Sequence, residues 1–334
     1  MAAVPLLICD DSGMARKQLL RALPQDWAVS VTQATNGQEG LEAIRRAQGQ
    51  VVLLDLTMPV MDGYQLLEAV RAEGHRSRII VVSGDVQDEA VRRVMELGAL
   101  AFLKKPVAPD DLLATLKRLD LLDPPGTAPA AAPLRPQEAS ISFTEAMREI
   151  VNVAMGRAAA LMARVLDVFV ELPVPNVNTL TVGELQMALV DAHANPQLTA
   201  VCQGFIGSGI AGEALLIFHD CDAADLSRLM LRDLALEYSD SEMLLDLSSL
   251  LVGACLSGIA EQVDVQFAQN HPHRLGSQGP IDELVRRNQP RWKPTLAVEI
   301  SYALEGHGIH FDLLLLFTED SVQLLRNKLA YVMN

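Results

Sequence analysis

Aromatic residues are scarce in this chain of 334 residues, because phenylalanine, tyrosine and tryptophan together make up only 4% of it. Alanine, valine, leucine and methionine must therefore fill the interior, which favours packed layers of helix and sheet over an aromatic-rich binding scaffold. Cysteine is also rare. Its four residues, Cys9, Cys202, Cys221 and Cys255, form no CxxC pair and have no metal-ligand spacing. They predict buried, reduced thiols in a cytoplasmic protein.

Two further features are missing, a long apolar stretch and an excess of positive charge. We expect no membrane span, because no apolar run approaches the roughly 18 residues that one needs. We also expect no signal peptide, because the N-terminus lacks a basic region. The net charge is −15, of which residues 1–120 carry −2 and the remainder −13. An acidic second half without a basic helix-turn-helix argues against nucleic acid as a partner.

Residues 1–122 alternate short apolar runs with segments of helical period. The apolar runs are Val4–Cys9, Ala28–Gln33, Val51–Leu54, Arg78–Val82 and Leu100–Leu103. The helical segments are Met14–Leu23, Gly37–Ala47, Gly63–Glu73, Gln87–Leu97 and Pro109–Leu119. This alternation predicts a flavodoxin-like, doubly wound α/β domain whose parallel sheet is covered on both faces. Functional residues of such a fold gather at the carboxyl ends of its strands.

Polar residues stand at four of these strand ends. Asp10 and Asp11 follow the first apolar run, Asp55 the third, Ser83 the fourth and Lys105 the fifth. Converging carboxylates repel one another unless a cation lies between them, and oxygen-only ligands suit Mg²⁺. Asp55 can then attack a phosphoryl donor, while Lys105 and the Ser83 hydroxyl hold the phosphoryl oxygens. The alternative, which any one motif alone would favour, is a set of solvated loop carboxylates.

This set of residues closely resembles the CheY-like receiver family, over about a third of the chain. The resemblance implies a two-component response regulator that a sensor histidine kinase phosphorylates on Asp55. It also implies that Asp11, Asp55 and the Thr57 carbonyl bind Mg²⁺ directly, with Asp10 acting through water.

The same resemblance implies a switch. Ser83 and Phe102 would be the pair that moves on phosphorylation, with Phe102 standing where some members of the family have tyrosine. A cis peptide between Lys105 and Pro106 would direct the lysine side chain inward.

A segment rich in proline and alanine, residues 123–137, predicts a linker to a second domain over residues 138–334. This domain contains an internal repeat, with copies near 141–235 and 238–334. Each copy begins with a long helix, continues through a proline-bearing segment and two strand-like runs, and ends in a closing helix. The long helices are expected at Phe143–Leu166 and Ser241–Gln262.

The spacing between matching positions supports the repeat. Glu149 and Asp246 are 97 positions apart, and Phe218 and Phe317 are 99 apart. We therefore expect a duplicated α/β domain with approximate two-fold symmetry. The glycine-rich stretch at 204–212 lies between two strand-like runs and has no lysine, so it predicts a hairpin turn and not a phosphate-binding loop.

The first long helix carries a polar pair, Glu149 and Asn152, on one face because the two residues are three positions apart. Twenty-two residues separate Asn152 from Pro175, and in the second copy the same number separates Ser249 from Pro272. The second copy thus preserves the spacing but not the residue types.

This spacing, the paired long helices and the duplication resemble the CheC/CheX/FliY family of chemotaxis phosphatases, over roughly residues 141–334. The resemblance implies a hydrolase acting on the aspartyl-phosphate of a receiver protein. Glu149 would pair with the conserved lysine of that receiver, and Asn152 would position the attacking water. Glu145 stands where the family often has Asp or Ser. The shorter side chains of Asp246 and Ser249 imply one active site at Glu149 and Asn152 and a vestigial second one.

Three hypotheses for the second domain follow. It dephosphorylates a partner receiver in trans, it acts on its own receiver as a timer, or it is a non-catalytic adaptor or dimerisation module controlled by phosphorylation of Asp55. The last of these would make a homodimer or another signalling protein the partner.

Overall fold

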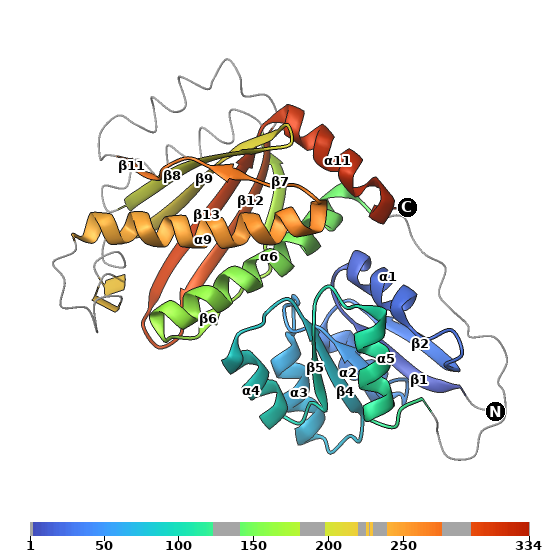
Figure 1. Ribbon diagram of the computed structural model, residues 1–334. Coiled ribbons are helices and arrows are strands. Elements are labelled where there is room, and N and C mark those ends of the chain that lie inside the picture. The colour runs from blue at the N-terminus through green and yellow to red at the C-terminus, as the bar shows by residue number, and fades with distance from the viewer. Residues whose placement is uncertain are drawn as a thin grey trace. The chain divides into compact units, whose positions relative to one another are not determined.

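The computed structural model of the chain describes residues 3–122, 141–180, 198–219, 225–226, 228–229, 239–275 and 295–333, and Figure 1 labels its helices and strands. The chain divides into two compact units, residues 1–149 with 332–334 and residues 150–331. The boundary falls inside one long helix, α6 (Phe143–Leu166), whose first turns belong to the first unit. The predicted linker at 123–137, the closing helix of the first repeat and Cys221 lie outside the described residues.

The first unit contains a parallel sheet of five strands in the order β2-β1-β3-β4-β5. The strands are β1 (Val4–Cys9), β2 (Val29–Ala34), β3 (Val51–Leu54), β4 (Arg78–Ser83) and β5 (Ala101–Lys104). The helices between and after them are α1 (Gly13–Ala22), α2 (Gly37–Arg45), α3 (Gly63–Ala72), α4 (Asp88–Glu96) and α5 (Pro109–Arg118). The predicted alternation and flavodoxin-like fold are confirmed, with boundaries shifted by one or two residues.

Both faces of this sheet are buried, which explains why its strands are continuous apolar runs. Because side chains alternate along a strand, Leu6 and Ile8 of β1 join one core while Leu7 and Cys9 join the other. Helices α1 and α5 cover the first face, and α2, α3 and α4 cover the second.

A tight loop after β3 fixes the backbone around Asp55. The Gly63 amide donates to the Leu56 carbonyl at 3.0 Å. A Cβ atom at Gly63 would collide with the Asp55 carbonyl and the Leu56 Cα, so only glycine allows this close approach. Asp62 begins α3 with a capping box shared with Gln65. The Met-Asp-Gly sequence thus holds the carboxyl end of β3 in place.

The second unit contains an antiparallel sheet in the order β10-β8-β9-β13-β12-β6, with β11 paired to β8 and β7 paired to β12. Its first strands are β6 (Val170–Glu171), β7 (Asn176–Leu180), β8 (Leu198–Gly207) and β9 (Ile210–His219). The later ones are β10 (Ala268–Gln269), β11 (His273–Leu275), β12 (Thr295–Leu304) and β13 (Ile309–Phe317). The hairpin predicted at 204–212 is confirmed, because β8 and β9 turn at Ser208 and Gly209, both with positive φ.

The pairing of these strands relates the two halves of the unit. The hairpins β8–β9 and β12–β13 meet at the antiparallel pair of β9 and β13. The short strands β6 and β7 of the first half pair with β12, and the short strands β10 and β11 of the second half pair with β8. Each half therefore completes the sheet of the other.

Two long helices, α6 and α9 (Asp240–Val263), pack together in this unit, and α11 (Glu319–Met333) follows the last strand. Gly258 of α9 lies so close to α6 that a Cβ atom there would meet the Cα and Cβ of Ala154. The Gln262 amide donates to the Ile150 carbonyl at 2.9 Å. Small side chains at the crossing thus let the two helices approach closely.

Helix α9 also packs against β8 and β11. Its segment Ser241–Val263 contains an 18-residue window with a mean hydropathy of 1.8, and by length and composition the helix could span a membrane. The expectation that no stretch approaches that length is therefore wrong for α9. In the structure 56% of that window is buried, as expected for a helix that packs on two partners.

Candidate functional site

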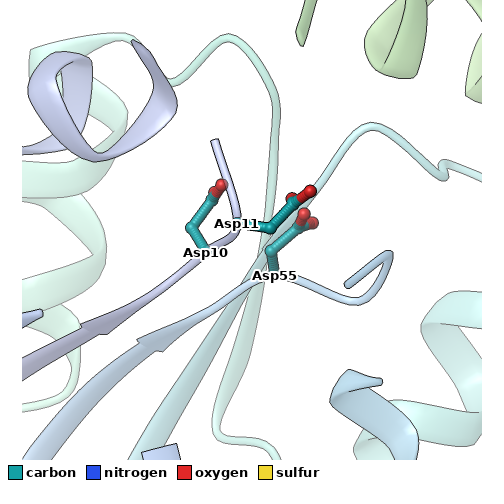
Figure 2. Close-up of side chains that lie close together, drawn as sticks. All are labelled: Asp10, Asp11 and Asp55. Carbon is teal, nitrogen blue, oxygen red and sulfur yellow. The ribbon is translucent and has the colours of Figure 1, made fainter. Parts of the chain in front are cut away.

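Three aspartates meet at the carboxyl edge of the parallel sheet, as Figure 2 shows. Asp10 and Asp11 directly follow β1, and Asp55 follows the neighbouring strand β3. One carboxylate oxygen from each lies within 4.8 Å of the others. Asp10 and Asp55 are both 1% exposed, whereas Asp11 is only partly buried. The strand-end rule therefore placed these three side chains correctly.

Lys105 brings a positive charge to the same point. Its ammonium Nζ lies 2.8 Å from Asp10 Oδ2 and 3.2 Å from Asp55 Oδ2. The side chain is buried, and the peptide bond between Lys105 and Pro106 is cis, as the resemblance implied. A third carboxylate oxygen, Glu149 Oε1, also lies 3.2 Å from this ammonium.

The electrostatics of this site are dominated by burial and by like charges. Burial, followed by the charges of Asp10, Glu149 and Asp11, raises the pKa of Asp55 well above its usual range, although Lys105 opposes the shift. Burial and Asp10 raise the pKa of Asp11 to about 6. Burial would lower the pKa of Lys105, but the neighbouring carboxylates outweigh it and raise that pKa. The site thus holds more negative charge than its lysine neutralises.

The donor set suits a hard divalent cation. It consists of carboxylate oxygens from Asp10, Asp11 and Asp55, close enough to share one ion. Mg²⁺ in proteins is commonly bound by one or two carboxylates together with water. The further ligand that the resemblance implies, the Thr57 carbonyl, lies two residues after Asp55 in the loop that follows β3.

Glu145 and Glu149 lie in the first turns of α6, which belong to the first unit, and both contact its site residues or their neighbours. Glu149 is 3% exposed, and burial raises its pKa while Lys105 opposes the shift. One turn earlier, Glu145 Oε1 accepts a hydrogen bond from the Gly13 amide at 2.8 Å. Glu145 and Gly13 were not among the predicted site residues, and their only sequence signals are the place of Glu145 four residues before Glu149 and the Asp-Asp-Ser-Gly run after β1.

The predicted switch residues lie at the ends of neighbouring strands. Ser83 closes β4 and is fully buried, and its hydroxyl accepts a hydrogen bond from the Asp85 amide at 3.1 Å. Phe102 lies on β5, is partly buried and packs against the core beneath α2, α3 and α4. The Asp85 carboxylate in turn accepts from the Gln87 amide at 3.1 Å. The backbone after Ser83 is therefore held by two successive hydrogen bonds, one to the Ser83 hydroxyl and one to the Asp85 carboxylate.

The two helices of the second domain differ in how they present their matching residues. On α6, Asn152 is 6% exposed and follows Glu149 by three positions. On α9, Asp246 is exposed and Ser249 is partly exposed. The suggestion that Asp246 and Ser249 form a vestigial site stays a prediction.

Comparison with known proteins identifies the first unit. The family described as the response regulator receiver domain matches residues 6–117. The nitrate/nitrite response regulator protein NarL of Escherichia coli is 32% identical over 176 residues, which is 49% of this chain and 81% of NarL. A protein-glutamate methylesterase/protein-glutamine glutaminase of Oleidesulfovibrio alaskensis is 40% identical over 107 residues, 31% of this chain but only 29% of the methylesterase.

Two solved structures are also similar. The signal receiver domain of a NarL response regulator from Mycobacterium tuberculosis has 29% identity and a TM-score of 0.34, covering 36% of this chain and 97% of that one. Thermotoga maritima FliY has 15% identity and a TM-score of 0.40, covering 57% of this chain and 96% of that one. The sequence matches carry the assignment. The chain belongs to the response regulator family of two-component signalling, through an N-terminal receiver domain.

Proposed function

We propose that this response regulator is phosphorylated on Asp55 by a sensor histidine kinase, and that its second domain hydrolyses receiver aspartyl-phosphate as the CheC/CheX/FliY phosphatases do. One observation carries the proposal. The carboxylate of Glu149, the first residue of the Glu-x-x-Asn pair, lies 3.2 Å from the ammonium of Lys105. A phosphatase of this class needs that pairing with the lysine of its substrate receiver.

In the phosphorylation step, a carboxylate oxygen of Asp55 attacks the phosphorus of the donor. A bond forms between that oxygen and phosphorus, and the bond between phosphorus and the donor nitrogen breaks. Lys105 and the Ser83 hydroxyl lie at the ends of adjacent strands, where they can hold phosphoryl oxygens. A magnesium ion held by Asp11, Asp55 and the Thr57 carbonyl, with Asp10 through water, would supply the remaining positive charge.

In the hydrolysis step, water attacks phosphorus in line with the Asp55 oxygen. The bond between that oxygen and phosphorus breaks, the carboxylate leaves, and the proton of the water passes to the released phosphate. Asn152 would orient the water through its amide, which can both donate and accept hydrogen bonds. Glu149 holds Lys105 in place. Loose phosphoryl transfer depends mainly on positioning and charge, so no general base is required.

The second copy of the repeat is proposed to lack this activity. The order of elements and the exchanged strand pairing of the two halves support a duplicated domain. Ser249, at the position of Asn152, is too short to reach a water in the same place. Asp246 is one methylene shorter than Glu149 and is exposed. One active site, on α6, is therefore proposed for the chain.

The test uses the full-length chain, loaded on Asp55 with a small phosphodonor such as acetyl phosphate. We expect Asn152→Ala to prolong the life of the phosphoryl group about tenfold or more, because it removes a group that positions the attacking water. Ser249→Ala is the matched control and should leave the decay unchanged. Equal decay in the wild type and both variants would contradict the phosphatase and favour the adaptor.

A further inference from the structure

The two long helices of the second domain begin with the same signature, Ser-x-x-Glu, but use the glutamate differently. In α9 both residues cap their own helix, because Ser239 and Glu242 form a complete capping box. In α6 the Glu145 amide donates to the Ser142 hydroxyl at 3.2 Å. The Glu145 carboxylate, however, accepts from the amide of Gly13, 132 positions away. Glu242 thus caps its own helix, whereas Glu145, at the matching position of the first copy, binds an amide of α1.

Gly13 is placed to accept this contact. It is the first residue of α1, directly after the N-cap Ser12 and the site residues Asp10 and Asp11. The amide groups at a helix N-terminus are free to bind a carboxylate, and the helix dipole favours a negative charge there. A Cβ atom at this position would collide with the Glu145 carboxylate. The contact therefore depends on glycine at the edge of the phosphorylation site.

The second contact lies one turn further along α6. Glu149 is on the same helical face as Glu145, four positions later, and its carboxylate is 3.2 Å from Lys105. The first turns of α6, which belong to the first unit, thus contact two different elements of that unit, α1 and the residue after β5.

We propose that the substrate of the phosphatase is the receiver of the same polypeptide, and that Glu145 is the residue that selects it by binding the Gly13 amide. This inference rests on the proposed function. Glu145 is a positioning residue, because it contacts neither the phosphoryl group nor the attacking water. Since enzyme and substrate share one chain, the reaction is intramolecular, and its rate does not depend on the concentration of the protein. The lifetime of the phosphoryl group on Asp55 is thus set by the chain that carries it.

The first experiment separates cis from trans action. Full-length protein loaded with phosphate at Asp55 should lose it with a first-order rate constant that is the same over a hundredfold range of concentration. Chains carrying Asn152→Ala are then loaded and mixed with excess unloaded Asp55→Asn chains, which retain Glu149 and Asn152. We expect less than a twofold acceleration. Acceleration that grows with the added chain and reaches the wild-type rate would overturn the inference but leave the proposed function standing.

The second experiment tests Glu145. Glu145→Ala should slow the decay about tenfold, the size expected for loss of one charge-assisted hydrogen bond, and Glu145→Gln should recover part of the rate. Gly13→Ala should slow it similarly and add little to Glu145→Ala. The matched control Glu242→Ala removes the capping box of α9 and should leave the rate unchanged.

Loading of Asp55 by acetyl phosphate should be the same in the Glu145 variants, which excludes a damaged receiver. Wild-type decay in Glu145→Ala would overturn the role of Glu145. If the wild type instead decays no faster than Asn152→Ala, the proposed function itself fails.

Discussion

At the scale of the residue, the site is a cluster of buried charges that opposes folding. Asp10, Asp55, Lys105 and Glu149 are each no more than 3% exposed. Removing charged groups from water costs several kcal/mol each, which mutual attraction only partly offsets. Burial, and then repulsion among the carboxylates around a single ammonium, raises the pKa values of Asp55 and Glu149. Such an arrangement is explained by its chemistry and not by a gain in stability.

Another buried carboxyl group, Asp85, gives a prediction that does not depend on the metal. Burial raises its pKa to about 6, although hydrogen bonds from Gln87 oppose the shift. Because the pKa is higher in the folded state than the usual 3.8, the folded chain binds the proton more tightly. The free energy of unfolding should therefore fall as the pH rises from about 4 to about 6, and stay lower above that.

Asp85→Asn should remove this fall in the free energy of unfolding between about pH 4 and about pH 6. The amide oxygen can still accept from Gln87 but carries no charge, so the variant should be more stable at pH 7.5 by on the order of 1–3 kcal/mol. At pH 4, where Asp85 is protonated, the two should be nearly equal. Urea unfolding of residues 1–122 at both pH values measures this. Asp120→Asn, at an exposed position, is the control. A gain of the same size at both pH values would contradict the titration of Asp85.

At the scale of the element, the sequence predicted the helices and strands of the receiver and the two long helices of the second domain, but not the short strands β6, β7, β10 and β11 or the contacts between elements. The bounds of β1, β3 and α6 agree with prediction, because apolar period and caps are local properties. The site residues at the strand ends were predictable for the same reason. The contact between Glu145 and Gly13 was not, because nothing in a Ser-x-x-Glu signature tells whether the glutamate will cap its own helix or bind a distant amide.

The crossing of α6 and α9 gives a prediction that compares two glycines of one helix. Gly258 faces the backbone of Ala154, and an added side chain must push the helices apart. Gly253 faces only the flexible end of Gln269, at 3.5 Å. Gly258→Val should therefore lower the free energy of unfolding by about 1–3 kcal/mol. Gly253→Ala should leave it unchanged or raise it by up to about 1 kcal/mol, because alanine favours the helix.

Urea unfolding of the full-length chain, followed by far-ultraviolet circular dichroism, measures both variants. Similar losses in the two would show that the close approach of Gly258 to α6 does not limit packing. The effect belongs to residues 150–331, so phosphorylation of Asp55 should be unaffected in either variant.

At the scale of the whole molecule, the negative charge is unevenly divided along the chain. Residues 1–120 have a net charge of −2 and the remainder −13, yet the described acidic cluster with ligand geometry lies in the less acidic part. The fold of the receiver places its aspartates on adjacent parallel strands, so a few charges converge there. In the second half the net charge is larger, and only its distribution over the surface decides what it attracts.

Magnesium should therefore act on the two units differently. Binding to the aspartate cluster stabilises only a folded receiver, by RT ln(1 + [Mg²⁺]/Kd), which is about 1.4 kcal/mol at ten times Kd. Amide hydrogen exchange of the full-length chain in 0.5 M NaCl, which screens weak surface binding, should show slower exchange in β1, β3 and β4 and little change in β8, β9 and β13. Asp11→Asn should abolish the difference. Equal protection of both units, or protection that survives Asp11→Asn, would mean that the ion binds the acidic surface and not the site.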